Sequence, residues 1–122
     1  MYHIGIDLIR LSRINPLAGQ WDDPFFQKTF TKKEHNFCLS TSNPIRSFTE
    51  AFAAKEAVFK ALNIDASQIR LNQIEILRTE TGRPSVTLLE PLLSQMSQKG
   101  IYSIDLSLSY DNDLVIAMAI AE

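Results

Sequence analysis

The chain has 122 residues, of which 45% are hydrophobic and 21% are charged, and its formal net charge is −2. This length and composition predict one domain, spanning residues 1–122, with a core of its own. The nearly balanced charge gives no support to nonspecific nucleic-acid binding, and every apolar stretch is shorter than the roughly 18 residues that suggest a membrane span. A single cysteine, Cys38, cannot form an internal disulfide, and no basic leader with an apolar run opens the chain. We therefore expect a reducing, cytoplasmic location.

The first predicted element is a strand over residues 3–8, in which apolar side chains alternate with Gly5 and Asp7. The apolar positions are Ile4, Ile6 and Leu8. A period of two is typical of a half-buried strand and puts Gly5 and Asp7 on one face. Glycine leaves an open notch beside the Asp7 carboxylate, which suits the close approach of a ligand or of another backbone. The alternative is that Asp7 only caps the turn that follows.

A helical turn is predicted after this strand, because Leu8, Leu11 and Ile14 have helical spacing and would share one side. Arg10 and Arg13 are also three residues apart and share the other side. Residues 16–24 are rich in Pro, Gly and Asp and are predicted to form a loop.

Two sequence patterns predict where the next helices begin. Thr31 and Glu34 have the spacing of a capping box, which predicts a helix that runs to about Leu39. Residues 40–44 then form a linker, because Pro44 forbids a continuous helix through it.

The central prediction is a helix over residues 48–62, with Ser47 and Glu50 as a second capping box. Its apolar stripe consists of Phe48, Phe52, Phe59 and Leu62. Glu56 and Lys60 are four residues apart and lie together at the edge of this stripe, beside small side chains. A phosphate-bearing ligand with a divalent metal would use both charges. The alternative is a salt bridge on a solvated face, which contributes only about 0.3–0.5 kcal/mol.

The second half of the chain is predicted to be mainly strands. The expected elements are strands over 73–78 and 85–89 with a hairpin turn at 80–84, a short helix between Pro91 and Gly100, and strands over 104–108 and 114–121. The last strand is apolar on both faces, which predicts that both are covered. In so small a domain, one cover could be another subunit. Together these elements predict an α+β fold in which an antiparallel sheet packs against helices.

Several motifs resemble those of one family, the bacterial holo-[acyl-carrier-protein] synthases, which are small single-domain 4′-phosphopantetheinyl transferases. The segments that resemble it are Gly5-Ile6-Asp7 followed by Arg13-Ile14, Phe30-Thr31-x-x-Glu34, Phe52-Ala53-Ala54-Lys55-Glu56-Ala57-x-x-Lys60-Ala61, Asn72-Gln73-Ile74-Glu75-Ile76 and Gly82-Arg83-Pro84. They are spread over nearly the whole chain.

The resemblance implies transfer of 4′-phosphopantetheine from coenzyme A to a serine of an apo acyl carrier protein, with release of 3′,5′-adenosine bisphosphate. It implies that Asp7 and Glu56 bind Mg²⁺, the cofactor, and that Lys60 contacts the pyrophosphate. Lys55, Arg83 and Pro84 are then candidates for binding coenzyme A, although Arg83 could equally be an exposed hairpin tip. The family also implies a homotrimer whose active sites are shared between neighbouring chains.

Carrier binding calls for basic residues, because acyl carrier proteins are generally acidic. Arg13 stands at the arginine position of the first motif, and Arg10 and Lys28 are plausible additions.

Four positions depart from the family pattern on the coenzyme A side. They are Ala51, Asn63, Asp105 and Tyr110, and each removes a possible cation or backbone donor. An alternative function is therefore a weakened relative that binds carrier protein or nucleotide without transfer.

Overall fold

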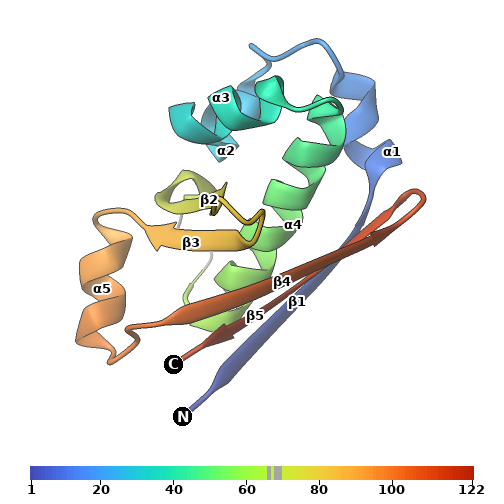
Figure 1. Ribbon diagram of the computed structural model, residues 1–122. Helices are drawn as coiled ribbons and strands as arrows, with labels where there is room; N and C mark the ends of the chain where they lie inside the picture. The colour runs from blue at the N-terminus through green and yellow to red at the C-terminus, as the bar shows by residue number, and fades with distance from the viewer. Residues whose placement is uncertain (66, 68–69) are drawn as a thin grey trace.

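The computed structural model describes residues 1–65, 67 and 70–122, and its centre is one long helix packed on a three-stranded sheet (Figure 1). The helix is α4 (Pro44–Leu62), and the antiparallel sheet has the order β1 (His3–Arg10), β5 (Leu114–Ala121), β4 (Ile104–Asp111). A separate antiparallel hairpin joins β2 (Ile74–Arg78) to β3 (Pro84–Leu88). The expected α+β fold with antiparallel sheet against helices is confirmed.

Shorter helices surround this centre. They are α1 (Leu11–Ile14), α2 (Pro24–Thr29), α3 (Lys32–Ser40), α5 (Leu92–Gln98) and the 3₁₀ turns Asn15–Leu17 and Leu71–Gln73. In Figure 1, α1, α2 and α3 gather around the N-terminal end of α4, while α5 stands at the far end of the hairpin. No helix in the described part of the chain is long and apolar enough to cross a membrane.

Strand β1 faces α4 with the side that carries Gly5, Asp7 and Ile9, and this reverses the expectation for a half-buried strand. Its apolar side chains point away from the helix: Ile4, Ile6 and Leu8 are 66%, 53% and 62% exposed. Gly5 is buried because the backbone of α4 fills its notch, where an added Cβ would lie 1.9 Å from the Ala57 carbonyl oxygen. A ligand or another backbone was expected to approach Gly5 closely, and the structure shows that it is another backbone.

Strand β5, like β1, places small residues against α4. Ala117, Ala119 and Ala121 are fully buried under α4, and Gly5 pairs with Ala119 across the β1–β5 ladder. Small side chains on both strands thus let the helix approach the sheet closely. The opposite side of the sheet carries a set of apolar side chains that we call the outer apolar face: Ile4, Ile6, Leu8, Ile116, Met118 and Ile120.

Helix α4 begins one turn earlier than its sequence predicted. Pro44 occupies the first turn, where a missing N–H is tolerated, and the Asn43 side chain caps the helix by accepting from the Arg46 N–H. The capping box expected at Ser47 and Glu50 was therefore wrong, since both lie inside the helix.

The capping box at Thr31 and Glu34 is confirmed, with both reciprocal hydrogen bonds present at the start of α3. Helix α2 was not expected. Asp23 caps it and Pro24 starts it, and it delivers Phe26 into a cluster of aromatic rings. The rings of Phe26 and Phe30 each lie 4.9 Å, centroid to centroid, from the ring of Phe48 on α4. These tilted and edge-to-face contacts anchor the helical layer to α4.

Candidate active site

Three charged side chains meet where β1 crosses α4: Asp7 from the strand, and Glu56 and Lys60 from the helix. The Lys60 ammonium lies 3.6 Å from the Asp7 Oδ1 atom and donates a 2.9 Å hydrogen bond to the Ile6 carbonyl oxygen. Lys60 is thus held by β1, and within the described chain it forms no ion pair with Glu56, its neighbour one turn away. The Lys60 side chain remains half exposed and can reach a ligand.

The two carboxylates of this cluster influence each other. Burial raises the pKa of Glu56, and the negative charge of Asp7 raises it further, while Lys60 and Arg13 act in the opposite direction. A bound cation would relieve the repulsion between the two carboxylates. No group of three His, Cys, Asp or Glu side chains converges anywhere in the described residues, so any metal here would have at most these two protein carboxylates.

The close approach of β1 to α4 creates this cluster. Only a glycine fits at position 5, because an added Cβ would also lie 2.6 Å from the Ala61 amide nitrogen. Asp7 is two residues further along the same face of β1, next to Ala117 of β5. Gly5 therefore brings the Asp7 carboxylate within reach of the Glu56 and Lys60 turn.

A cleft of about 410 Å³ opens beside Lys60. Its lining residues are Tyr2, His3, Ile4, Lys60, Ala61 and Asn63. Asn63 ends α4 in the left-handed conformation (φ 50°). The cleft gives a ligand direct access to the ammonium of Lys60.

Lys55 does not occupy the position expected for a coenzyme A ligand. Its side chain is fully buried, and its ammonium lies 2.8 Å from Glu34 Oε1 and donates to the carbonyl oxygens of Leu71 and Ile74. Three acceptors around one ammonium leave no donor for a phosphate. Lys55 is therefore a structural residue in this fold, and its expected place at coenzyme A was wrong.

Glu34 is the centre of this buried network. Its carboxylate accepts from Lys55 and from the N–H groups of Thr31 and Ile76, each at 2.8 Å. Burial raises the pKa of Glu34 and lowers the pKa of Lys55, whereas their mutual attraction opposes both changes. With three donors around the carboxylate and three acceptors around the ammonium, we assign the pair as ionised. The sequence suggested only the capping role of Glu34, because nothing local links it to Lys55.

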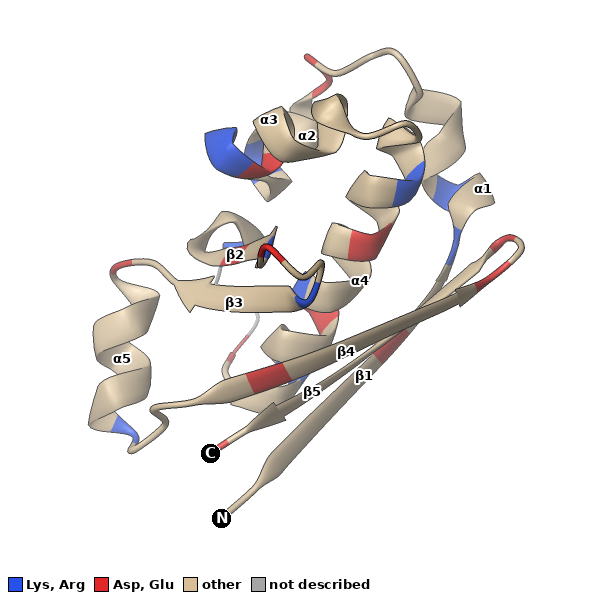
Figure 2. Ribbon diagram, in the orientation of Figure 1, with Lys and Arg blue, Asp and Glu red and all other residues tan. Residues whose placement is uncertain are grey.

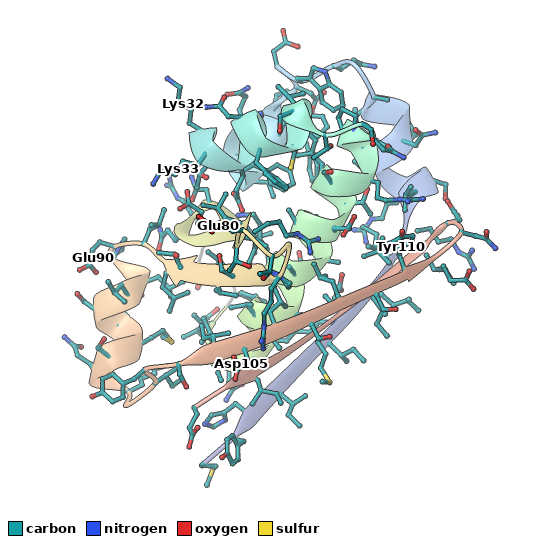
Figure 3. The ribbon with its side chains drawn as sticks, in the orientation of Figure 1. Lys32, Lys33, Glu80, Glu90, Asp105 and Tyr110 are labelled. Carbon is teal, nitrogen blue, oxygen red and sulfur yellow. The ribbon has the colours of Figure 1, made fainter. Side chains whose placement is uncertain are left out.

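Arg83 and Pro84 do not join the Asp7 cluster within one chain. Arg83 lies in the hairpin turn and Pro84 begins β3. This turn lies over β4 in Figure 2, whereas Asp7 lies on β1 at the other edge of the sheet. Arg83 lines a cleft of about 190 Å³ with Asp105 of β4 and with Met118 of the outer apolar face. Figure 3 shows Asp105 on the strand that runs beneath the hairpin.

The three basic residues expected to bind the acyl carrier protein lie in two separate regions, one near α1 and one on α2. Arg13 lies near the cluster, since its charge acts on Glu56, and its guanidinium carbon is 5.9 Å from the centroid of the Phe52 ring. Arg10 lies just before α1 and is exposed, 3.9 Å from Asp113. Lys28 lies on α2 and lines another cleft with Arg70, and Figures 1 and 2 show that this corner is well separated from α1.

Comparison with known proteins fits this arrangement of residues. The sequence model of the 4′-phosphopantetheinyl transferase superfamily matches residues 3–119. The chain belongs to this superfamily. A holo-[acyl-carrier-protein] synthase of Chlamydia trachomatis serovar L2 is 37% identical over 123 residues, which cover 100% of both proteins. The resemblance found in the sequence motifs is confirmed.

Solved structures of the same family have the same fold. The holo-[acyl-carrier-protein] synthase of Neisseria meningitidis superposes with a TM-score of 0.87 at 29% identity, over 98% of this chain and 97% of that one. The Helicobacter pylori holo-[acyl-carrier-protein] synthase, in complex with coenzyme A, gives a TM-score of 0.81 at 27% identity over 98% and 99% of the two chains.

Proposed function

We propose that this chain transfers 4′-phosphopantetheine from coenzyme A to a serine of an apo acyl carrier protein and releases 3′,5′-adenosine bisphosphate. The observation that carries the proposal is the meeting of Asp7, Glu56 and Lys60 at the Gly5 contact. These residues stand at the motif positions that the family resemblance points to, and they come from two elements that are far apart in the sequence.

In this proposal Asp7 and Glu56 hold Mg²⁺. The mutual repulsion of the two carboxylates supports the assignment, as does their number, because Mg²⁺ commonly takes one or two protein carboxylates and completes its shell with water and phosphate oxygens. The bound ion would supply charge neutralisation at the pyrophosphate.

The reaction is attack of the serine oxygen on the β-phosphorus of coenzyme A, with cleavage of the bond from that phosphorus to the bridging oxygen. The bridging oxygen departs with 3′,5′-adenosine bisphosphate. Lys60 is placed to stabilise this departing charge, since its ammonium is fixed by the Ile6 carbonyl and remains half exposed. Asp7 and Glu56 are the groups of the cluster that can accept the serine proton.

We further propose a homotrimer with active sites between subunits. The outer apolar face supports it, because four of its side chains, Ile4, Ile6, Leu8 and Met118, are more than 40% exposed in the single chain. Arg83 stands at the rim of this face, so the hairpin of one chain is suited to complete the coenzyme A site of its neighbour. In the cytoplasm, Arg13 and Arg10 would receive the acidic carrier, and Lys28 would contact it further away.

The alternative of a weakened relative has one specific observation in its favour. Asp105 shares the cleft of Arg83 and places a negative charge beside a candidate phosphate ligand. Under this alternative the chain would bind coenzyme A or carrier protein without turnover.

Product analysis separates the two functions. The chain is incubated with coenzyme A, Mg²⁺ and an apo acyl carrier protein, and the nucleotides are resolved by chromatography. We expect 3′,5′-adenosine bisphosphate to accumulate only in the complete mixture and to be lost when Mg²⁺ is chelated. Retention of intact coenzyme A in the complete mixture, with measurable binding, would favour the weakened relative.

A further inference from the structure

One ion pair connects the hairpin turn to the central helix. The Arg78 guanidinium, at the end of β2, lies 2.7 Å from the Glu50 carboxylate of α4 through its Nη2 atom. Its Nη1 atom donates a 3.1 Å hydrogen bond to the carbonyl oxygen of Gly82 in the turn. The Arg78 and Glu50 side chains are only 25% and 16% exposed, so solvent competes weakly with this contact.

The turn itself is closely hydrogen-bonded. The Thr79 N–H donates to the Arg83 carbonyl at 2.8 Å, and the Gly82 N–H donates to the Thr79 carbonyl at 2.9 Å. The Arg83 N–H donates to the Thr79 hydroxyl at 3.2 Å, and Gly82 takes the positive φ of 84° that this tight path requires. The backbone of Arg83 is therefore fixed in a frame that Arg78 ties to α4.

The side chain of Arg83 then projects from this frame into the cleft that it shares with Asp105 and Met118. A long, flexible cation at a surface loses conformational freedom when it binds an anion, and this loss weakens binding. Because the backbone of Arg83 is already fixed, only its side chain loses conformational freedom when it binds. The position of Arg83 relative to the sheet thus depends on the Glu50–Arg78 contact.

We propose that Arg78, held by Glu50, is a positioning residue that sets Arg83 for binding a coenzyme A phosphate. The inference rests on the proposed function, in which Arg83 belongs to the coenzyme A site. Neither Arg78 nor Glu50 touches the reacting atoms in this account, so their effect is on the affinity for coenzyme A and is transmitted through Arg83.

A double-mutant cycle on the full-length enzyme tests this. KM for coenzyme A and kcat are measured for Arg78→Ala, Arg83→Ala and the double variant. We expect each single variant to raise KM about tenfold and to leave kcat within about twofold. We expect the double variant to resemble Arg83→Ala alone, because Arg78 acts through Arg83. The proposal is overturned if the effects of the two single substitutions on KM multiply in the double variant. It is also overturned if Arg78→Ala leaves KM unchanged.

Two further variants separate positioning from simple loss of stability. Glu50→Gln keeps the size of the side chain and should raise KM less than Arg78→Ala, and Arg78→Lys, which keeps a cation beside Glu50 and a donor for the Gly82 carbonyl, should keep KM nearer to the wild-type value than Arg78→Ala does. Glu80→Gln is the matched control, since it removes a negative charge from the same exposed turn, where Glu80 forms no ion pair with any described residue. A KM for Arg78→Lys as high as that of Arg78→Ala, with an unchanged melting temperature, counts against the inference. If the wild type itself releases no bisphosphate, the proposed function fails instead.

Discussion

Lys60 is anchored by the strand and not by its own helix. A hydrogen bond to the Ile6 carbonyl and the nearby Asp7 carboxylate fix its ammonium at the mouth of the cleft. The spacing of Glu56 and Lys60 predicted that the two charges lie together, and this alone was compatible with an ordinary surface salt bridge. The strand contact, which no helical spacing reveals, distinguishes the two interpretations.

Replacement of Lys60 tests its role in the reaction. We expect Lys60→Ala to lower kcat/KM for coenzyme A by roughly 10²–10³, comparable to the loss of one oriented donor to a developing charge. If Lys60 served only its contact with Asp7, the loss would stay below about fivefold. Steady-state kinetics separates these outcomes, and Lys99→Ala, an exposed lysine just after α5, is the control.

Lys55, unlike Lys60, is buried: it belongs to the same sequence motif, but its side chain is part of the core. We expect Lys55→Met to destabilise the protein by about 3–5 kcal/mol, because it leaves the Glu34 carboxylate buried without its cation. Chemical denaturation measures the change. Adding Glu34→Gln to this variant should recover part of the loss, since the uncompensated charge is then gone. A stability within about 1 kcal/mol of wild type would contradict the assigned ion pair.

At the scale of elements, residue spacing predicted most strands and helices but not which face each would bury. The alternation in β1 identified a strand, yet its apolar residues lie on the outer face because α4 requires glycine and alanine beneath it. Two capping-box patterns looked alike, and only the one at Thr31 was real, because Asn43 and Pro44 begin α4 earlier. Asp7 and Glu56 could be proposed from their motifs, whereas the partner of Lys55 depends on tertiary packing.

The contact between β1 and α4 can be tested at Gly5. We expect Gly5→Ala to destabilise the protein by at least about 2 kcal/mol, because its Cβ would collide with the backbone of Ala57 and Ala61, which no side-chain rotation can relieve. Thermal unfolding measures this loss. Gly19→Ala is the control without a collision: no atom lies within 4 Å of an added Cβ there, so only the positive φ of Gly19, 85°, opposes the alanine, and the cost should be about 1 kcal/mol. Equal effects of the two substitutions would contradict a close helix–strand contact.

At the scale of the whole molecule, the two sides of β5 have different roles. The alanines bind α4, whereas Ile116 and Met118 are exposed with the apolar residues of β1. The sequence suggested that a second layer covers this strand, and the structure identifies which face is left uncovered in a single chain. In the proposed trimer, this outer apolar face is the contact between subunits.

A charge on the outer apolar face tests this assembly. We expect Met118→Glu to convert a trimer into monomers or aggregates and to reduce transfer, because the carboxylate would be buried without a partner at the contact. Light scattering coupled to size-exclusion chromatography measures the mass of each species. Lys99→Glu, which places a carboxylate just after α5 and away from this face, should leave the mass unchanged. A wild-type protein that is a fully active monomer would rule the trimer out.

Intact-mass measurement of the carrier protein tests whether Asp7 and Glu56 form the catalytic centre of a phosphopantetheinyl transferase. Apo acyl carrier protein is incubated with coenzyme A, Mg²⁺ and either the wild type, Asp7→Ala or Glu56→Ala, with the fold of each variant checked by thermal melting. With the wild type we predict a gain of about 340 Da on the carrier, the mass of the transferred phosphopantetheine. With either variant, most of the carrier should remain unmodified over the same time. A wild type that leaves the carrier mass unchanged, or a variant that modifies it at the wild-type rate at low Mg²⁺, would contradict the account.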